Sequence, residues 1–244
     1  MTDSPWEHRI QGWPGVAGGF VGRSQRPPGG RLIHCPKYAA ALADIGLPDG
    51  PIVEAQQVHE AEVALVTERD LGSPPAPVTR ILGVDGLITD LPGVALAIYV
   101  ADCLAIYLHH RARPAIGLAH AGWRGLAADI PGVLLRGALR AFGGEPADLR
   151  IALSPCIGPC CFEVGEEVAR VFEHIPGVVD RSRPRPHVDL SGVAMAQLLA
   201  AGVPSEHIEV MPGCTRCEPE RLASHRWDPE RCGRNVALLA LTPS

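Results

Sequence analysis

Short apolar runs alternate with polar positions along the middle of the chain. Three of them lie close together: Val94–Val100, Leu104–Leu108 and Pro114–Ala119. Runs of this length, bounded by turn signals, are typical of buried strands. A polar pair, Asp102 and Cys103, separates the first two runs, and His120 follows the third. The pattern predicts neighbouring buried strands that carry a thiol and an imidazole at their ends.

The flanking segments predict further strands and several helices. Apolar runs predict strands at Gly18–Arg23, Ile52–Val58, Glu62–Thr67, Val84–Thr89, Arg150–Leu153, Ile208–Met211 and Asn235–Leu241. Helix-forming composition predicts helices at Pro36–Ile45, Trp123–Phe142, Glu163–His174 and Asp189–Ala201. Pro131 interrupts the second helix and predicts a kink or two shorter helices there. We interpret His109 and His110 as a polar turn.

Strands and helices are mixed along the chain, without repeats or a low-complexity linker. We therefore expect an α/β (α+β) fold, with a mixed β-sheet covered by helices in a single domain over residues 1–244. A 46% hydrophobic and 20% charged composition is ordinary for a globular protein. The net charge of −5 gives no electrostatic case for nucleic acid or an anionic membrane as partner.

The N-terminal residues and the length of the apolar runs indicate where in the cell the protein is located. Residues 1–8 contain no basic region followed by an apolar stretch, as a signal peptide would. No apolar run reaches the ~20 residues that span a bilayer. We therefore expect a cytoplasmic protein, in which the 8 cysteines are free, metal-bound or catalytic rather than paired in disulfides.

His59, Cys103 and His120 each come at or shortly after the end of an apolar run. If those strands share one sheet and run in the same direction, the three side chains converge at one edge. Imidazole and thiolate are preferred ligands of zinc and copper, and three protein ligands with a fourth position open to water are typical of catalytic zinc. The three residues together predict such a metal site.

The same residues also permit a reading without metal. Cys103 would be a nucleophile, His120 its base, and Asp102 or a backbone group would orient the imidazole. This alternative gives His59 no role.

The remaining cysteines carry a weaker signal. Cys214-x-x-Cys217 has the spacing of a zinc ribbon or a redox pair. A ribbon needs a second spaced pair, whereas Cys160 and Cys161 are adjacent, and Glu218-Pro219 argues against a redox helix. We interpret Cys214 and Cys217 as turn residues. The others are interpreted as small apolar residues: Cys35, Cys156, Cys160, Cys161 and Cys232.

Three arginines near predicted strand ends are candidates for binding a phosphate or carboxylate: Arg23, Arg124 and Arg226. Arg124 is the best placed of them, since it follows His120 at the start of a predicted helix, where backbone N–H groups also favour anions.

Several motifs occur together in a fixed order. They are Gln57-Val58-His59, Asp85-Gly86-Leu87-Ile88-Thr89, Ala101-Asp102-Cys103-Leu104, Ala119-His120-Ala121-Gly122-Trp123-Arg124-Gly125, Pro155-Cys156-Ile157-Gly158-Pro159-Cys160-Cys161-Phe162-Glu163-Val164, Cys214-Thr215-x-Cys217, Ser224-His225-Arg226 and Gly233-Arg234. From about residue 55 to 240 the chain resembles the YfiH-like family, also labelled laccase-like multicopper polyphenol oxidase, peptidoglycan editing factor and purine nucleoside phosphorylase. Residues 1–50 diverge from the family pattern.

The resemblance implies a single-domain α/β fold and one metal, zinc, held by His59, Cys103 and His120, with copper possible in vitro. It also implies phosphorolysis of adenosine, inosine and methylthioadenosine to the free base and (methylthio)ribose 1-phosphate, and deamination of adenosine to inosine. The partners would be purine nucleosides and phosphate. Arg23, Arg124 and Arg226 are then candidates for the phosphate, and Asp102 and His225 for protonating the leaving purine.

Two segments depart from the family pattern. A Ser24–Arg31 stretch replaces the usual Gly-Gly-x-Ser turn, although Arg23 still fits its position. Ala223-Ser224-His225-Arg226-Trp227 keeps the arginine but loses an apolar neighbour and a charge. Substrate-binding groups in these segments are therefore expected to differ from those of the family.

Three other functions stay open. A cysteine hydrolase would use Cys103 and His120 on a peptidoglycan precursor. A laccase-like polyphenol oxidase would need several copper centres, whereas only one metal cluster is predicted. A non-enzymatic protein with a structural metal would need a fourth protein ligand beside His59, Cys103 and His120.

Overall fold

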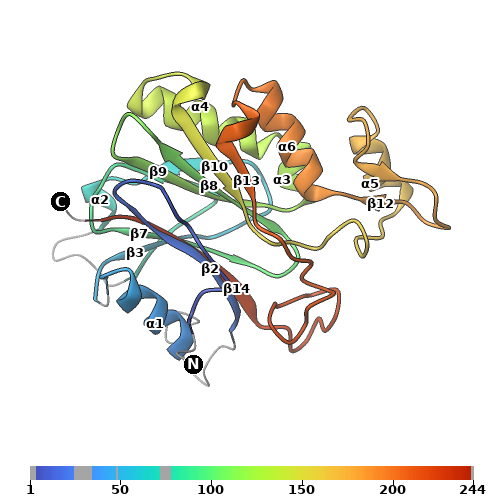
Figure 1. Cartoon of the computed structure of the whole chain (residues 1–244), viewed down its shortest axis with the longest axis horizontal. Helices are drawn as coiled ribbons and strands as arrows, with labels where there is room; N and C mark the ends of the chain where they lie inside the picture. The colour runs from blue at the N-terminus through green and yellow to red at the C-terminus, as the bar shows by residue number, and fades with distance from the viewer. Residues whose placement is uncertain (1–3, 25–34, 48, 72–77, 243–244) are drawn as a thin grey trace.

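The chain folds into two stacked β-sheets with helices on both outer faces (Figure 1). The computed structural model describes residues 4–24, 35–47, 49–71 and 78–242. The first sheet contains six strands in the order β1 (His8–Arg9), β2 (Val16–Ser24), β14 (Arg234–Leu241), β7 (Ala95–Val100), β3 (Ile52–Ala55) and β5 (Val78–Ile81). The second sheet has the order β13 (Ile208–Val210), β10 (Leu149–Leu153), β8 (Leu104–His110), β9 (Ala115–Ala121), β6 (Gly86–Thr89) and β4 (Val63–Leu65).

Both sheets are mixed. In the first, β3 runs parallel to β5 and β7, whereas β14 is antiparallel to β2 and β7. In the second, β8 and β9 are antiparallel, and parallel pairs lie at the edges. A short third sheet pairs β11 (Val179–Asp180) with β12 (His187–Val188). The α/β class predicted from sequence is confirmed, with two mixed sheets in place of the expected one.

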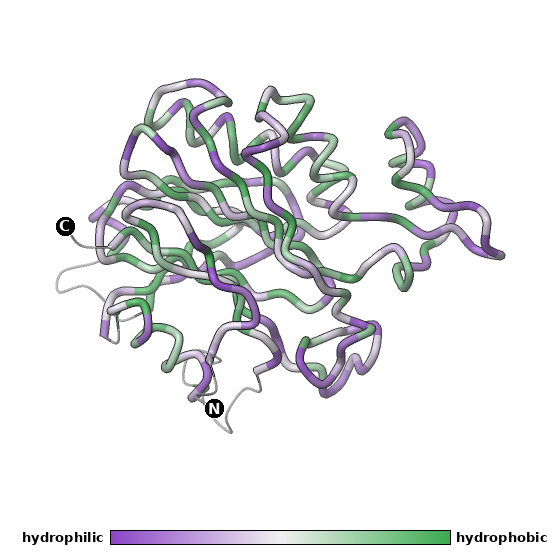
Figure 2. Tube along the Cα trace, in the orientation of Figure 1, coloured by the Kyte–Doolittle hydropathy of each residue, from purple (hydrophilic) through white to green (hydrophobic). Residues whose placement is uncertain are grey.

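The central core lies between the two large sheets. Phe20 and Leu96 of the first sheet pack in one apolar cluster with Tyr107 and Leu118 of the second, and all four are fully buried. Coloured by hydropathy, the strands form the green centre of the molecule and the loops its purple periphery (Figure 2). The central strands read as apolar runs because both of their faces are covered.

Six α-helices accompany the sheets in the described residues: α1 (Pro36–Asp44), α2 (Glu68–Leu71), α3 (Trp123–Ala127), α4 (Ile130–Phe142), α5 (Glu166–Phe172) and α6 (Leu190–Ala200). Helix α1 packs on the outer face of the first sheet, and α3, α4 and α6 cover the second. The expected interruption at Pro131 is confirmed: α3 ends, Asp129 caps α4 through Gly132 N, and Pro131 lies in the first turn. No helix among these is long and apolar enough to cross a membrane.

His109 and His110 are not a polar turn. They form the end of β8 and are 3% and 1% exposed. His109 pairs with Arg150 of β10 and stacks on the Trp13 ring at 5.5 Å, and His110 Nε2 lies 3.0 Å from Gly143 O. Strand β8 therefore continues through His109 and His110, because β9 and β10 pair with it on either side. Residues 25–31 of the predicted Ser24–Arg31 loop lie outside the described residues.

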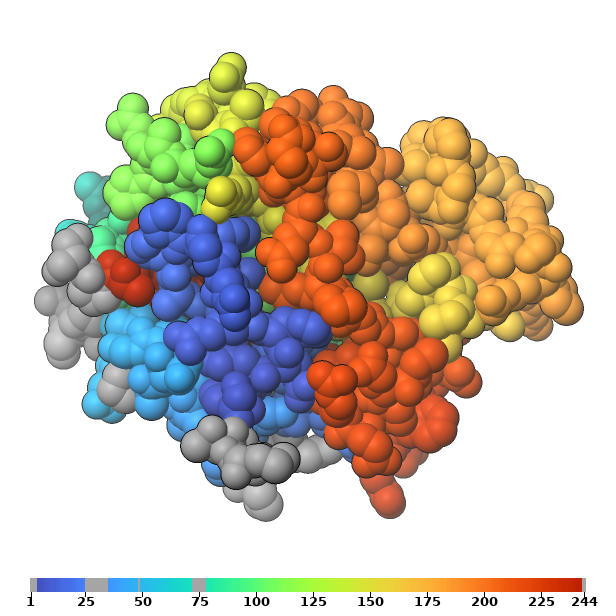
Figure 3. Space-filling view, viewed as in Figure 1, coloured from blue at the N-terminus to red at the C-terminus, as the bar shows by residue number. Residues whose placement is uncertain are grey.

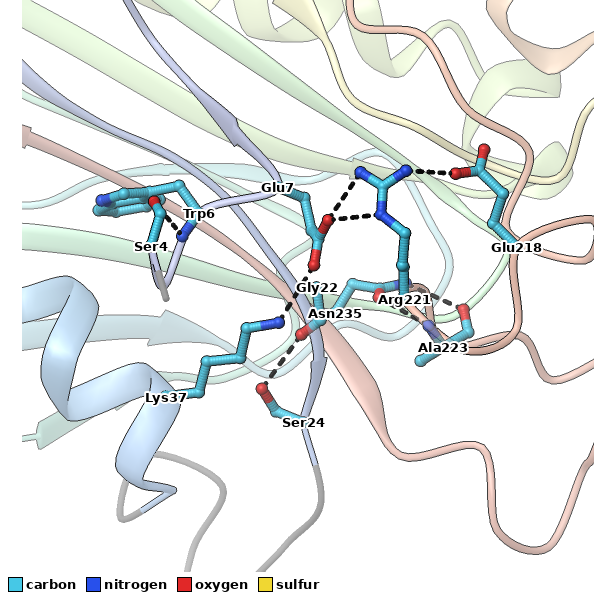
Figure 4. A network of polar contacts seen from close by, with 10 residues as sticks. All are labelled: Ser4, Trp6, Glu7, Gly22, Ser24, Lys37, Glu218, Arg221, Ala223 and Asn235. Carbon is cyan, nitrogen blue, oxygen red and sulfur yellow. Dashed lines mark hydrogen bonds and ion pairs between the residues drawn. The ribbon is translucent and has the colours of Figure 1, made fainter. Parts of the chain in front are cut away.

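Two loops beyond the second sheet border the candidate site. We call residues 154–165 the β10–α5 loop and residues 211–233 the C-terminal loop; they lie beside each other at the yellow and orange-red edge of the molecule (Figure 3). Arg221 donates to Glu7 and Glu218, Lys37 donates to Glu7, and Asn235 exchanges two hydrogen bonds with the Ala223 backbone (Figure 4). These contacts fix the C-terminal loop to the N-terminal strands.

Candidate metal centre and its cavity

Cys103 and His120 meet at one edge of the second sheet. Strands β8 and β9 are antiparallel, with Leu104 paired to Ala121 and Ala105 to His120. Because β8 begins where β9 ends, the residue before β8 and the imidazole near the end of β9 reach the same edge. The sequence predicts convergence if the runs before His59, Cys103 and His120 share one sheet and one direction. Strands β3 and β7, which precede His59 and Cys103, are parallel neighbours in the first sheet, whereas β9, which carries His120, belongs to the second. The expectation is therefore wrong for His120 only.

His59 reaches this edge from the other sheet. It follows β3 on a loop in which Gln57 and His59 have φ of 59° and 65°, in the left-handed region. The Gln57 amide accepts from Tyr99 N at 2.9 Å and donates to Tyr99 O at 2.6 Å, so its side chain continues the pairing with β7. The ordered loop turns His59 out of the first sheet and towards Cys103.

Asp85 holds both histidines in place. Its carboxylate accepts from the backbone N–H groups of Val58, His59 and Glu60 at 2.9–3.1 Å. Asp85 Oδ1 also lies 2.7 Å from His120 Nδ1, and the carboxylate is fully buried. Because Nδ1 donates a hydrogen bond to Asp85, the Nε2 atom of His120 is left free to bind a metal ion. A carboxylate behind a metal-binding histidine fixes its tautomer and its orientation.

Sequence reasoning missed this role of Asp85. The apolar run predicts a strand over Val84–Thr89 and gives Asp85 no function, whereas in the structure Asp85 directly precedes β6. The available signal was a lone carboxylate beside a buried apolar run, since a buried charge needs partners. The carboxylate hydrogen-bonded to His120 is that of Asp85, not Asp102.

The donor atoms of His59, Cys103 and His120 all lie within 4.8 Å of one another. The two imidazole rings meet edge to face with centroids 4.8 Å apart. Gly122 lies against the group: a Cβ there would be 3.0 Å from Cys103 Sγ. Among the described residues this group contains three donors, and Asp85 is saturated by its own hydrogen bonds. Three donors with an open fourth position fit a catalytic rather than a structural metal site.

Hydrogen bonding shifts the protonation of the group. Burial alone raises the pKa of the Cys103 thiol, but hydrogen bonds with His120 and His59 lower it to about 7. Burial alone lowers the pKa of His120, but hydrogen bonds to Asp85 and Cys103 raise it to about 9. Burial alone raises the pKa of Asp85, but hydrogen bonds from His120 and from backbone N–H groups outweigh this effect and lower it below its usual value. In the absence of metal, the arrangement favours a thiolate beside an imidazolium.

A cavity of about 850 Å³ opens above the three donors. Ligand sites for small molecules have volumes of roughly 300–1,000 Å³. Ile157 and Phe162 of the β10–α5 loop form an apolar part of its wall. Its polar lining comes from both sheets, the segments that follow their strands and the C-terminal loop: Glu54, Gln56, Gln57, His59, Arg80, Tyr99, Asp102, Cys103, His120, His225, Arg226, Glu230 and Arg234. The cavity can therefore accept a ligand of nucleoside size, with cationic groups on its wall.

Asp102 lines the cavity and connects its two sides. Its φ of 82° is uncommon for a residue other than glycine. Its two carboxylate oxygens accept from Thr215 Oγ1 and Arg226 N, each at 2.6 Å. These bonds fix the backbone immediately before Cys103. Because both oxygens already accept hydrogen bonds from the protein, the arrangement suits a positioning residue.

The other predicted residues divide into two groups. His225 and Arg226 line the cavity, and the Arg226 guanidinium donates to Glu163 O and lies 5.7 Å from the Phe162 ring centre. Arg23 and Arg124 do not line it. Arg23 donates to the carbonyls of Pro219 and Arg231, and Arg124 covers the Trp123 ring at 4.3 Å. Helix α3 at Arg124 is only 5 residues long.

The cavity wall also contains a buried acid that sequence reasoning did not single out. Glu54 is 1% exposed, pairs with Arg80 at 2.8 Å and accepts a hydrogen bond from Tyr99 Oη. The signal in the sequence is a carboxylate within the apolar strand β3, which needs a cation and a donor once it is buried. Arg80 and Arg234 thus add to Arg226 as cations around the cavity.

Cys214 and Cys217 bound a turn, as predicted, but the interpretation of Cys160 and Cys161 as small apolar residues of the buried kind is wrong, since Cys160 is exposed and Cys161 half-buried. Cys160 and Cys161 of the β10–α5 loop meet Cys214 and Cys217 of the C-terminal loop, with all four Sγ atoms within 4.8 Å of one another. Adjacent cysteines on one loop can therefore complement a spaced pair on another. The described residues thus contain two groups that could hold a metal ion, not one.

Known proteins share this architecture. The chain is 39% identical over 194 residues to a protein of Geobacillus stearothermophilus named purine nucleoside phosphorylase YlmD, covering 75% of this chain and 70% of that one. It is 32% identical over 192 residues to adenosine deaminase RL5 from an unknown prokaryotic organism, covering 75% and 72%. The crystal structure of YlmD from Geobacillus stearothermophilus superposes with a TM-score of 0.82 at 31% identity, covering 97% of each chain.

A structure of Bacillus licheniformis YfiH matches equally well, with a TM-score of 0.82, 31% identity and coverage of 99% of this chain and 98% of that one. Residues 36–242 match the family described as multi-copper polyphenol oxidoreductase laccase, a span that contains both groups of metal donors and every residue that lines the cavity. With that span, and with the fold of YfiH and YlmD, the chain belongs to the multi-copper polyphenol oxidoreductase laccase family, the YfiH-like family.

Proposed function

We propose that this protein is a zinc-dependent purine nucleoside phosphorylase that also deaminates adenosine, acting in the cytoplasm as a single-domain enzyme. The observation that carries the proposal is the placement of three metal donors beneath a cavity of about 850 Å³ with arginines on its wall. The names of two relatives, purine nucleoside phosphorylase YlmD and adenosine deaminase RL5, support the same substrate class. The substrates would be adenosine, inosine and methylthioadenosine, with phosphate as co-substrate.

The donor set fits zinc. His59, Cys103 and His120 would hold the ion, and zinc bound there would act as a Lewis acid that lowers the pKa of water to about 7. Asp85 keeps the proton of His120 on Nδ1, which leaves Nε2 for the ion. Gly122 leaves room beside Cys103 Sγ that a side chain would fill.

The wall residues supply binding and proton transfer. Arg226 is the proposed phosphate ligand, with Arg80 and Arg234 on the same cavity. In phosphorolysis a phosphate oxygen bonds to ribose C1′ while the bond from C1′ to purine N9 breaks. The leaving purine takes a proton, and we assign that donation to His225. In deamination water adds to adenine C6 and ammonia leaves. Asp102 positions Arg226 and Cys103 for both reactions.

A cysteine hydrolase is the second candidate, and one observation favours it. Cys103, His120 and Asp85 form a chain of hydrogen-bonded groups in the order nucleophile, base and orienting carboxylate. Its substrate would be a peptidoglycan precursor. This candidate gives no use to His59, which the same buried Asp85 orders through its backbone N–H.

The test combines metal analysis with product analysis. Protein purified without added metal is incubated with adenosine, with and without phosphate, and the products are separated by chromatography. We expect zinc in the protein, inosine without phosphate, and adenine with ribose 1-phosphate when phosphate is present. Unchanged nucleoside under both conditions would overturn the proposal.

One substitution separates the two candidates. His59→Ala removes a metal donor but leaves Cys103, His120 and Asp85 intact. A zinc enzyme loses several kcal/mol of transition-state stabilisation, which is at least ~10³-fold in kcat/KM. A cysteine hydrolase would keep most of its activity and would be inactivated by alkylation rather than by chelation. His174→Ala, at an exposed histidine at the end of α5, is the matched control and should leave activity unchanged.

A further inference from the structure

Four cysteines from two loops form a second, separate group of donors. Cys160 and Cys161 lie on the β10–α5 loop, and Cys214 and Cys217 on the C-terminal loop. Their Sγ atoms all lie within 4.8 Å of one another, and all four thiols are free. Each cysteine of one loop is at least 53 positions along the chain from each cysteine of the other, so the tertiary fold and not a local turn brings them together.

The sulfur separations match a tetrahedral ion rather than a disulfide. Cys217 Sγ lies 3.7 Å from Cys160 Sγ and 3.4 Å from Cys161 Sγ. A tetrahedral zinc with Zn–S bonds of about 2.3 Å places its sulfurs about 3.8 Å apart. A disulfide would require a separation of about 2.05 Å. The cysteines therefore surround a point at which a zinc ion could contact each of them.

Neighbouring groups suit the negative charge of such a site. Gly158 N donates to Cys214 Sγ at 3.2 Å, and the Arg216 guanidinium donates to Cys161 Sγ at 3.7 Å. Four thiolates around a zinc ion carry a net charge of −2, which a guanidinium and a backbone N–H help to balance. Gly158 also packs closely, since a Cβ there would lie 3.3 Å from Cys160 Sγ and 3.5 Å from Cys214 Sγ.

We propose that Cys160, Cys161, Cys214 and Cys217 bind a second zinc ion, whose function is structural. Four protein ligands leave no open position, as in structural zinc sites. The ion would clamp the two loops that form one wall of the cavity. Ile157 and Phe162 come from one loop, and His225 and Arg226 from the other.

The clamp also reaches the first metal centre. Thr215 lies between two of the cysteines, and its hydroxyl donates to Asp102, the residue before Cys103. Zinc at the four cysteines would therefore hold the hydrogen-bond partner of a strained backbone position beside the catalytic donors. The second site does not depend on which reaction the first site performs.

The metal content of defined variants tests the proposal. Each protein is purified under reducing conditions without added metal, and zinc and copper are counted per chain by elemental analysis. We expect about two zinc ions in the wild type and about one in the double variant Cys214→Ser/Cys217→Ser. Cys35→Ser, at a buried cysteine of the first sheet's outer core, is the matched control and should retain two. Equal zinc in the wild type and the double variant would overturn the proposal.

A spectroscopic measurement covers the case in which the double variant fails to fold. His59→Ala removes a donor of the first centre and leaves the four cysteines intact. Cobalt(II) loaded into this variant should bind at about one ion per chain and give the intense sulfur-to-metal absorption of a tetrahedral four-thiolate site. Absence of that absorption would contradict the proposal. So would copper in place of zinc in the elemental analysis, or a disulfide between the two loops in unreduced protein.

Discussion

The two donor groups of this molecule are built in opposite ways. The group of His59, Cys103 and His120 lies where strands end, over a buried carboxylate that accepts four hydrogen bonds. The group of four cysteines lies on two loops, with Cys160 and Cys217 exposed. In the first the sheets fix the donors before any ion binds, whereas in the second an ion would fix the loops.

This difference indicates different functions. Three preorganised donors leave a position for substrate or water, and the surrounding cavity accepts a ligand. Four thiolates close the coordination shell and can only hold structure. The bond between Thr215 and Asp102 connects the two, so the loop arrangement bears on the geometry next to Cys103. Catalytic and structural metal would thus act on opposite sides of one wall.

The largest effect within the first group is expected for Asp85→Asn. The carboxylate accepts from His120 and His59 N–H through Oδ1 and from Val58 and Glu60 N–H through Oδ2. An amide has one acceptor oxygen, so one of these two pairs loses its acceptor. Loss of such a partner typically weakens metal binding or activity about 10–100-fold. Competition with a zinc-binding dye measures the affinity at the first site, and the four-cysteine site should not change.

The control for this prediction is Asp90→Asn, at an exposed carboxylate just after β6. It should bind zinc as the wild type does. Unaltered affinity in Asp85→Asn would mean that the carboxylate fixes the loop without influencing the metal donors.

A smaller effect is expected for Thr215→Val, which keeps the shape of the side chain and removes its hydroxyl. Thr215 is fully buried, and its loss leaves one Asp102 oxygen without its donor. Asp102 is half-buried, and the loss of a hydrogen bond to its carboxylate is expected to cost about 1–2 kcal/mol. Thermal unfolding should show this loss, and kcat/KM should fall while both metals remain bound. Thr67→Val, at an exposed threonine, is the control. Equal kcat/KM in both variants would show that the hydrogen bond between Thr215 and Asp102 does not influence the first metal site.

The first group was predictable from sequence because its residues adjoin apolar runs. His59, Cys103 and His120 are marked by their positions after such runs, whatever the direction of the strands. The predicted reason for their convergence holds for β3 and β7, which are parallel neighbours in the first sheet, and is wrong for β9, which belongs to the second. Periodicity identifies a strand but does not assign it to a sheet.

The second group was predictable only in part, because the zinc-type spacing of Cys214-x-x-Cys217 has no second spaced pair to match it in the sequence. Cys160 and Cys161 have no spacing motif, and they meet Cys214 and Cys217 only after the β10–α5 loop and the C-terminal loop pack together. Arg23 and Arg124 are the opposite case, because both are candidates in the sequence but neither lines the cavity. Arg23 donates to loop carbonyls, and Arg124 covers the Trp123 ring. Long-range loop contacts depend on tertiary packing, which motif spacing does not encode.

Crowding of the first group gives the next smaller effect. In Gly122→Ala the new methyl would lie 3.0 Å from Cys103 Sγ, so the thiolate must move by a few tenths of an ångström. Overpacking of this kind costs about 1 kcal/mol or more. We expect a lower Tm and weaker zinc binding at the first site only. Gly137→Ala, whose nearest contact would be 3.6 Å, is the matched control. Equal zinc affinity in the two variants would show that the thiolate accommodates a methyl group without loss.

The smallest effect concerns the anchor of the C-terminal loop. Glu7 has a side chain only 14% exposed, so burial raises its pKa, but hydrogen bonds from Arg221 and Lys37 outweigh this and lower it below the usual value. A depressed carboxyl pKa stabilises the fold above the unfolded-state pKa of about 4.3, and this contribution is lost as pH falls through the folded-state pKa. Glu7→Gln should therefore cost about 1 kcal/mol at neutral pH and nothing once the carboxyl is protonated. Urea unfolding of Glu7→Gln and of the exposed-site control Glu209→Gln at pH 7 and in acid measures this. A difference that persists in acid would assign the stability to packing of the Glu7 side chain against Gly22 rather than to the ion pairs drawn in Figure 4.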